Sequence, residues 1–135
     1  MEYYDSSLNS ATPFAARREA STLTYFADGQ PVASLTTARI GNYNISSDQA
    51  LLIGWDLVNR SATPFKGSID EVRIWNRALS DAEIKSGISR SMQSDEIGLL
   101  GYWSFDEGSG ELVRDRSGNN YHGVIFGASW LSERN

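Results

Sequence analysis

The sequence has 135 residues, which suits one domain. Its formal net charge of −5 argues against nucleic acid and anionic membrane surfaces as partners, and the absence of cysteine excludes disulfides and thiolate metal sites. No apolar run approaches the roughly 20 residues of a membrane helix, and the start of the chain lacks the pattern of a signal peptide.

Residues 1–21 have no clear hydrophobic period and are predicted to be an irregular lead-in with one weak strand at most. Residues 22–135 are predicted to form the domain itself. There, two apolar runs flank Asp28-Gly29, the dipeptide favoured in tight type I′ turns. The sequence therefore predicts a β-hairpin with strands over Thr22–Phe26 and Pro31–Leu35.

The middle of the chain predicts two more strands and one helix. Ala50–Asp56 is a short continuous apolar run, and Gly67–Asn76 is rich in β-branched and aromatic residues, so both are typical of strands. Ser80 and Glu83 have the spacing of a capping box. A short helix is therefore expected over Asp81–Arg90, weakened by a glycine in its second half.

The last part of the sequence alternates strand patterns with polar turns. The segment "IGLLGYWSFDEGSG" predicts a strand with Trp103 and Phe105 on one face, and "HGVIFGASW" predicts a final strand that ends near Trp130. Core packing is expected for Trp75, Trp103 and Trp130. Because strands dominate and the helix lies between them, the predicted class is an all-β antiparallel jelly-roll sandwich with one short helix.

Four segments together resemble the laminin G-like, concanavalin A-like jelly-roll family: "TYFADGQPVAS", "FKGSIDEVRIWNRALSDAEI", "GLLGYWSFDEGSG" and "DRSGNNYHGVIFGASW". The resemblance implies two packed antiparallel sheets and a secreted or cell-surface module that binds sugar or protein, often with calcium. The six or seven predicted strands are fewer than such domains usually have. The chain is therefore either a fragment or a minimal form completed by self-association, and "GYWSFDEGSG" either closes this domain or begins a neighbouring one.

Asp70 is predicted to share the apolar face of the 67–76 strand with Val72, because side chains alternate along a strand. A buried carboxylate needs a partner. Asp115, Ser117 and Asn119 offer alternating oxygen ligands of the kind that calcium prefers, although their spacing is not that of an EF-hand. Calcium held by these residues and Asp70 is one hypothesis. The alternative is that Asp70 accepts backbone N–H groups and that the 115–119 segment is a simple turn.

Three remaining features bear on function. Trp55 and Tyr43 lie near loops and are the predicted sugar-stacking residues. His122 is the only histidine, so a zinc site is not expected and a hydrogen-bonded turn residue is. The adjacent carboxylates at 70–71 and at 106–107 would point to opposite faces of a strand, unlike a glycosidase pair. The sequence therefore predicts a non-catalytic extracellular recognition module, or else a structural domain that assembles with another chain.

Overall fold

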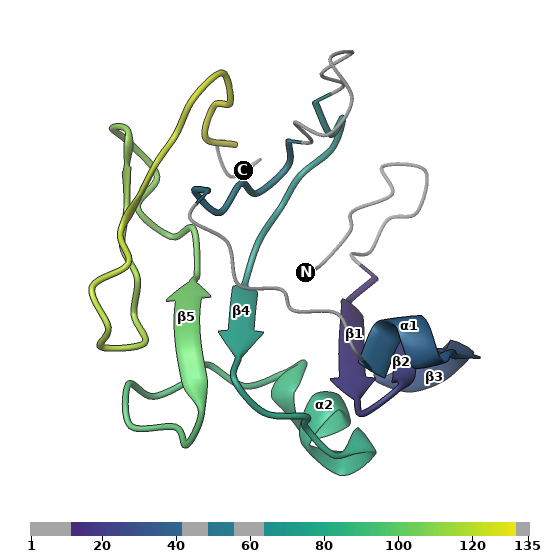
Figure 1. Cartoon of the computed structure of the whole chain (residues 1–135). Coiled ribbons are helices and arrows are strands. Elements are labelled where there is room, and N and C mark those ends of the chain that lie inside the picture. The colour runs from purple at the N-terminus through teal and green to yellow at the C-terminus, as the bar shows by residue number, and fades with distance from the viewer. Residues whose placement is uncertain (1–11, 42–48, 56–63, 132–135) are drawn as a thin grey trace.

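The described part of the chain forms three small antiparallel sheets and two short helices. Figure 1 shows the strands of two of these sheets as arrows and both helices as ribbons. The structure is a computed structural model that describes residues 12–41, 49–55 and 64–131. The elements are β1 (Phe14–Glu19), β2 (Thr22–Ala27), β3 (Gln30–Thr36), α1 (Ala38–Gly41), β4 (Val72–Trp75), α2 (Asp81–Gly87), β5 (Leu99–Trp103), β6 (Leu112–Val113) and β7 (Gly123–Val124). The sheets are β1-β2-β3, β4-β5 and β6-β7. This architecture confirms the predicted all-β class and adds one helix, α1, that the sequence pattern did not indicate.

The first sheet is built around the predicted hairpin. Both turn residues have positive φ, 50° at Asp28 and 69° at Gly29, as a type I′ turn requires. β2 and β3 flank this turn and pair from Thr22–Thr36 to Ala27–Gln30. β1 pairs with the other edge of β2 along all six of its residues, so a regular strand lies within the segment expected to be an irregular lead-in.

Gly29 is fixed both by its backbone conformation and by a close contact with α2. A Cβ atom at this position would lie 2.9 Å from the Cα of Lys85. We expect Gly29→Ala to lower the free energy of unfolding by about 2 kcal/mol in urea denaturation, because strain and overlap add. Gly108 has a similar φ of 67° and nothing within 4 Å of such a Cβ. The control Gly108→Ala should cost about 1 kcal/mol, and equal losses would contradict a role for the helix contact.

The predicted capping box starts α2. The backbone N–H of Glu83 donates to Ser80 Oγ (3.2 Å), and the Glu83 carboxylate accepts from the backbone N–H of Ser80 (2.7 Å). The helix ends at Gly87, three residues before the predicted end at Arg90. The Gly87 carbonyl accepts a hydrogen bond from the guanidinium of Arg73 on β4 (2.7 Å). The C-terminal end of α2 is therefore capped by a hydrogen bond from a residue of the second sheet.

The second sheet joins two segments that are far apart in the sequence. β4 and β5 pair antiparallel, with Val72 opposite Trp103 and Arg73 opposite Tyr102. The "GLLGYWSF" segment thus pairs with the strand of the preceding motif and shares one sheet with it. Two small buried clusters flank the sheet. One contains Val72, Trp103 and Val113, and the other contains Met92, Leu99 and Tyr102.

The three tryptophans predicted to be core residues contact these clusters. Trp103 is buried within the first cluster, Trp130 packs against the same cluster, and Trp75 packs against the second. The Nε1–H group of Trp130 donates to the carbonyl of Gly110 (2.7 Å), and that of Trp103 donates to the carbonyl of Tyr121 (2.9 Å). The prediction of core packing is confirmed for all three rings.

Several predicted strands are shorter than expected. Residues 50–55 form no strand, and position 56 lies outside the described residues. Gly54 has a φ of 78°, which breaks an extended conformation, and its carbonyl accepts from the N–H of Phe65 (2.8 Å) instead of from a sheet partner. The 67–76 strand is reduced to Val72–Trp75, and the final strand to Gly123–Val124.

Candidate functional site

Asp115 is the buried centre of the polar turn that follows β6. Its Oδ1 atom accepts from the backbone N–H groups of Tyr102 (3.0 Å) and Ser117 (2.8 Å). Its Oδ2 atom accepts from the backbone N–H of Tyr121 (2.9 Å) and lies 2.8 Å from the hydroxyl of Ser117. One carboxylate thus links β5 to both sides of the turn.

The hydrogen bonds to Asp115 also determine its charge. Burial by itself would raise the pKa of this carboxyl, but the donors from Ser117, Tyr102 and Tyr121 outweigh burial and lower the pKa below its ordinary value of 3.8. The side-chain amide of Asn119 completes the turn by donating to the carbonyl of Leu100 (3.0 Å). The Asp115 carboxylate is therefore held in its charged form, and the hydrogen-bond donors around it stabilise that charge.

This geometry does not fit the calcium site predicted from Asp70, Asp115, Ser117 and Asn119. Both carboxylate oxygens of Asp115 face N–H or O–H donors, and Asn119 presents its amide nitrogen to the turn. Within the described ranges, no three Asp, Glu or His side chains gather closely enough to hold a metal ion. The structure supports the alternative for this segment, a turn held by hydrogen bonds, and calcium binding stays a prediction.

Asp70 is an exposed residue that precedes β4, so the prediction that it shares the buried face of Val72 is wrong. Glu71 has a φ of 52°, in the left-handed region, and this interrupts the alternation of side chains. Oδ1 of Asp70 accepts from the N–H of Glu71 (3.0 Å). Partial burial of the carboxyl raises the pKa of Asp70, and the negative charges of Glu71 and Asp106 add to this effect.

His122 has the structural role predicted for it. Its Nδ1 atom accepts a hydrogen bond from the backbone N–H of Asp115 (3.1 Å). The ring therefore supports the same turn that the Asp115 carboxylate holds.

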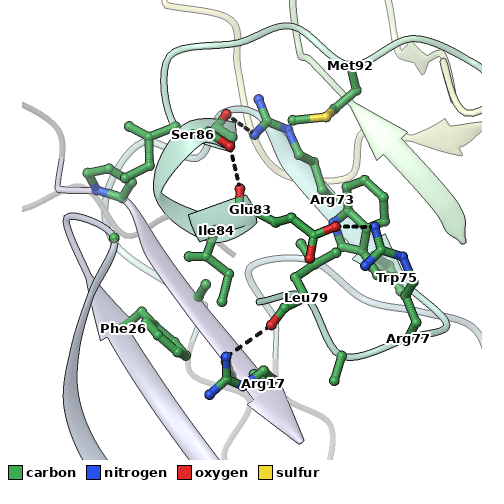
Figure 2. A pocket seen from close by; sticks show the side chains of 18 of the residues that line it. Arg17, Phe26, Arg73, Trp75, Arg77, Leu79, Glu83, Ile84, Ser86 and Met92 are labelled. Carbon is green, nitrogen blue, oxygen red and sulfur yellow. Dashed lines mark hydrogen bonds and ion pairs between the residues drawn. The ribbon is translucent and has the colours of Figure 1, made fainter. Parts of the chain in front are cut away.

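A cleft of about 760 Å³ separates β1 from β4 and α2 (Figure 2). Aromatic rings line it from both sides, with Phe26 from β2 and Trp75 from β4. A guanidinium group covers each of these rings. Arg17 lies 5.0 Å from the ring centroid of Phe26, and Arg77 lies 5.5 Å from that of Trp75. These ring faces are thus already occupied by cation–π contacts and are not free to stack on a ligand.

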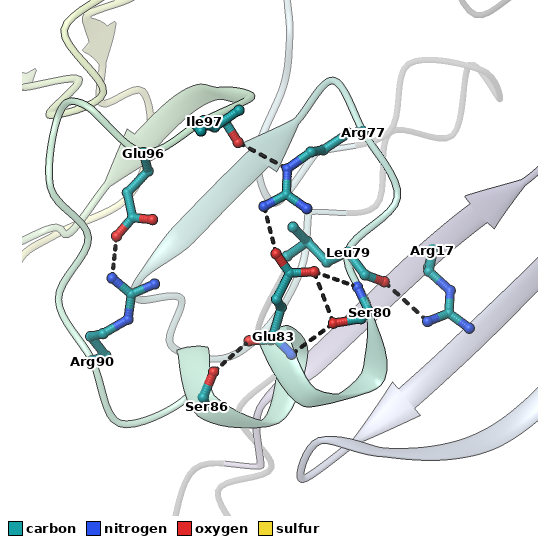
Figure 3. A network of polar contacts seen from close by, with 9 residues as sticks. All are labelled: Arg17, Arg77, Leu79, Ser80, Glu83, Ser86, Arg90, Glu96 and Ile97. Carbon is teal, nitrogen blue, oxygen red and sulfur yellow. Dashed lines mark hydrogen bonds and ion pairs between the residues drawn. The ribbon is translucent and has the colours of Figure 1, made fainter.

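Four charged groups of the cleft form two pairs (Figure 3). Arg77 donates to Glu83 (2.7 Å) and to the carbonyl of Ile97 (2.9 Å), and Arg90 pairs with Glu96. The hydrogen bond from Arg77, together with those from Ser80, lowers the pKa of Glu83 to about 2. The hydrogen bond from Arg90 lowers the pKa of Glu96. Both carboxylates are therefore held ionised, which is unsuited to a general acid.

An exposed pair of aromatic rings lies on a different part of the surface. The ring centroids of Trp55 and Phe126 are 6.3 Å apart, with their planes tilted by 55°. Trp55 retains 36% of its accessible surface and Phe126 retains 84%. The sequence pattern indicated Trp55 but not Phe126, which lies within the predicted final strand. The adjoining Gly127, a common turn residue, was the signal that could have indicated a loop. Tyr43, the other predicted stacking residue, lies outside the described residues.

None of the helices in the described ranges has both the length and the apolar character needed to cross a bilayer.

Comparison with known proteins agrees with the fold. A family model for the concanavalin A-like lectin/glucanases superfamily matches residues 5–85, which is more than half of the chain. A crystal structure from Bacteroides ovatus, named as a candidate carbohydrate-binding protein, superposes with a TM-score of 0.70 at 21% identity. The match covers 85% of this chain but 34% of that one, so the chain spans about a third of that structure's length. No curated protein gives a significant match. The chain belongs to the concanavalin A-like lectin/glucanase superfamily.

Proposed function

We propose that this chain is a non-catalytic carbohydrate-binding module that stacks a sugar on the Trp55–Phe126 ring pair. The observation that carries the proposal is the exposure of these two rings side by side, 6.3 Å apart. Exposed aromatic rings offer a large rigid surface at a low cost in conformational entropy. The superfamily and the carbohydrate-binding name of the Bacteroides ovatus structure support the same class of ligand.

The ring pair suits a sugar because a pyranose has an apolar face of C–H groups and a rim of hydroxyls. With centroids 6.3 Å apart and planes tilted by 55°, the two rings contact each other and together present an apolar surface on which a sugar ring can lie. Each ring contact is worth about 1 kcal/mol beyond the area that it buries. We therefore expect binding in the micromolar to millimolar range for a short oligosaccharide.

A binding role is favoured over glycan hydrolysis by the state of the carboxyl groups. Glycosidases need one carboxyl with a raised pKa that faces a second carboxylate across the substrate. In the cleft, the pKa values of Glu83 and Glu96 are lowered, and Glu71 is bound to Arg73 and to the hydroxyl of Tyr102. Among the described residues, the carboxyl with a raised pKa is that of Asp70, which does not line the cleft.

We also propose an extracellular setting, secreted or at a cell surface, because the laminin G-like resemblance implies it. Calcium is a weaker part of the proposal, since the Asp115 turn does not fit the ion. A protein surface is the other ligand class that exposed rings could bind, and a sugar screen with no positive member would favour it.

The test is a binding screen against immobilised glycans, followed by calorimetric titration of the best soluble oligosaccharide, whose signal does not depend on any one tryptophan. We expect Trp55→Ala and Phe126→Ala each to weaken binding about tenfold or more. The matched control is Phe14→Ala, which removes a partly exposed ring that lines the cleft. If binding depends on Phe14 and is insensitive to the other two rings, the sugar binds in the cleft and the proposed Trp55–Phe126 site is wrong.

A further inference from the structure

β3 is the edge strand of the first sheet, and all seven of its residues are exposed. Val32 retains 62% of its accessible surface and Leu35 retains 56%. The sheet order β1-β2-β3 leaves the outer edge of β3 without a strand partner in the described part of the chain. An edge of this kind is a template on which another strand can form hydrogen bonds.

The sequence of β3 has few of the features that usually protect an edge. "QPVASLT" contains no charged residue, in a chain whose net charge is −5. Exposed edges are commonly blocked by Lys, by proline or by a very short strand. In β3, the one residue of this kind is Pro31, at the second position of the strand. Residues Val32–Thr36 contain no proline, so their backbone groups remain available for pairing. These five residues could approach a second copy without charge repulsion.

The two ends of the strand carry opposite charges. Asp28 precedes β3 in the hairpin turn, Arg39 follows it in α1, and both residues are exposed. In an antiparallel pair of identical strands, the beginning of one strand lies beside the end of the other. Asp28 of each copy would then lie at the same end of the paired strands as Arg39 of its partner. The two-fold symmetry would give this pair of opposite charges at both ends of the interface.

We propose that β3 is a homodimer interface, in which the β3 strands of two copies pair antiparallel across a two-fold axis near Ser34. Ser34 is the centre of the five residues that follow Pro31. The axis sets Val32 opposite Thr36 and Ala33 opposite Leu35, and it joins the two three-stranded sheets into one of six strands. The contact is isologous, as closed dimers require.

The size of the contact sets the expected strength. Five residues from each copy form a small interface, at the low end of the range for specific complexes, so the dimer should be weak and depend on concentration. Because the Asp28–Arg39 contacts lie at the surface, salt should weaken it further. Pairing of this kind would double the number of sugar sites and raise avidity. It does not depend on sugar binding and is tested separately.

Sedimentation equilibrium of the full chain from about 10 µM to about 1 mM tests the interface. We expect a monomer–dimer equilibrium for the natural sequence. Ser34→Lys sets two like charges face to face at the axis and should abolish the dimer, and Ser34→Glu should do the same. An equimolar mixture of the two variants should restore it. Ser109→Lys, at an exposed serine far along the chain in a loop, is the control and should leave it unchanged.

Three outcomes would overturn the proposal. The first is a natural chain that stays monomeric at the highest concentration. The second is a dimer that survives Ser34→Lys. The third is a mixture of the two variants that stays monomeric while circular dichroism and cooperative melts show that both are folded.

Discussion

Asp115→Ala is expected to lower the free energy of unfolding by about 3 kcal/mol or more. The substitution leaves the N–H groups of Tyr102, Ser117 and Tyr121 without their acceptor, along with the hydroxyl of Ser117. Each buried donor without a partner costs about 1–3 kcal/mol, less where water enters. Urea denaturation measures this loss of stability, provided that the m-value is the same for the variant and the natural chain. The melting temperature should fall by roughly 10 °C.

The matched control is Asp70→Ala, which removes the other carboxylate of the predicted calcium site. Asp70 is exposed and accepts one hydrogen bond, from the N–H of Glu71, so its loss should cost less than about 1 kcal/mol. Melts of the natural chain in excess calcium and in EDTA complete the test. A calcium-dependent rise that both substitutions abolish would contradict the hydrogen-bonded turn and restore the metal site.

The pH dependence of Asp115 follows from the same contacts. Because the folded-state pKa of Asp115 lies below its ordinary value of 3.8, its contribution is fully present above that value. The contribution is lost as the pH falls through the lower, folded-state pKa. The difference in stability between the natural chain and Asp115→Ala should therefore be constant near neutral pH and shrink in acid. A difference in stability that grows in acid would show that folding raises the pKa of Asp115 and does not lower it.

Arg73→Ala is the second substitution with a large expected effect, about 2–3 kcal/mol. The guanidinium of Arg73 donates to the carbonyls of Gly87 (2.7 Å) and Arg90 (3.0 Å), where α2 ends, and forms an ion pair with Glu71. It also lies 5.4 Å from the ring centroid of Tyr102. A cation at this place also stabilises the helix dipole. The substitution should release α2 from β4.

Two variants show whether the geometry of Arg73 or its charge matters. Arg73→Lys keeps the charge but cannot reach both carbonyls and Glu71 in one plane, so it should recover less than half of the loss. Arg77→Ala removes a more exposed partner of Glu83 and should cost much less than Arg73→Ala, because solvent screens the exposed ion pair. Hydrogen exchange of the α2 amides should increase for Arg73→Ala alone. Equal exchange in the two alanine variants would contradict the anchoring role.

The elements that were predicted well depend on contacts between near neighbours in the chain. The Asp28-Gly29 turn requires two residues that tolerate positive φ, and the start of α2 requires Ser80 and Glu83 three residues apart. The packing of Trp75, Trp103 and Trp130 in or against the buried clusters followed from apolar patterns. The ends of the strands were predicted poorly, because Glu71 and Gly54 adopt positive φ, and a residue pattern does not reveal this for a glutamate.

The candidate site was only half visible in the sequence. Trp55 could be selected because it stands beside a loop, but its neighbour Phe126 is 71 positions further along the chain (126 − 55), and only folding brings the rings together. Similarly, Asp115 could be recognised as a candidate oxygen ligand. Its actual role depends on the N–H group of Tyr102 on β5, which no local spacing predicts.

The sequence by itself determined the all-β class, the hairpin, the helix cap and the likeness to laminin G-like domains, because these follow from local backbone preferences and from motifs. Only the tertiary structure decided that Asp70 is exposed, that Asp115 is satisfied by hydrogen bonds, and that Phe126 joins Trp55. The physical reason is that a polar or aromatic side chain acquires its role from the groups that surround it. Long-range packing of β4, β5 and the turns supplies those groups.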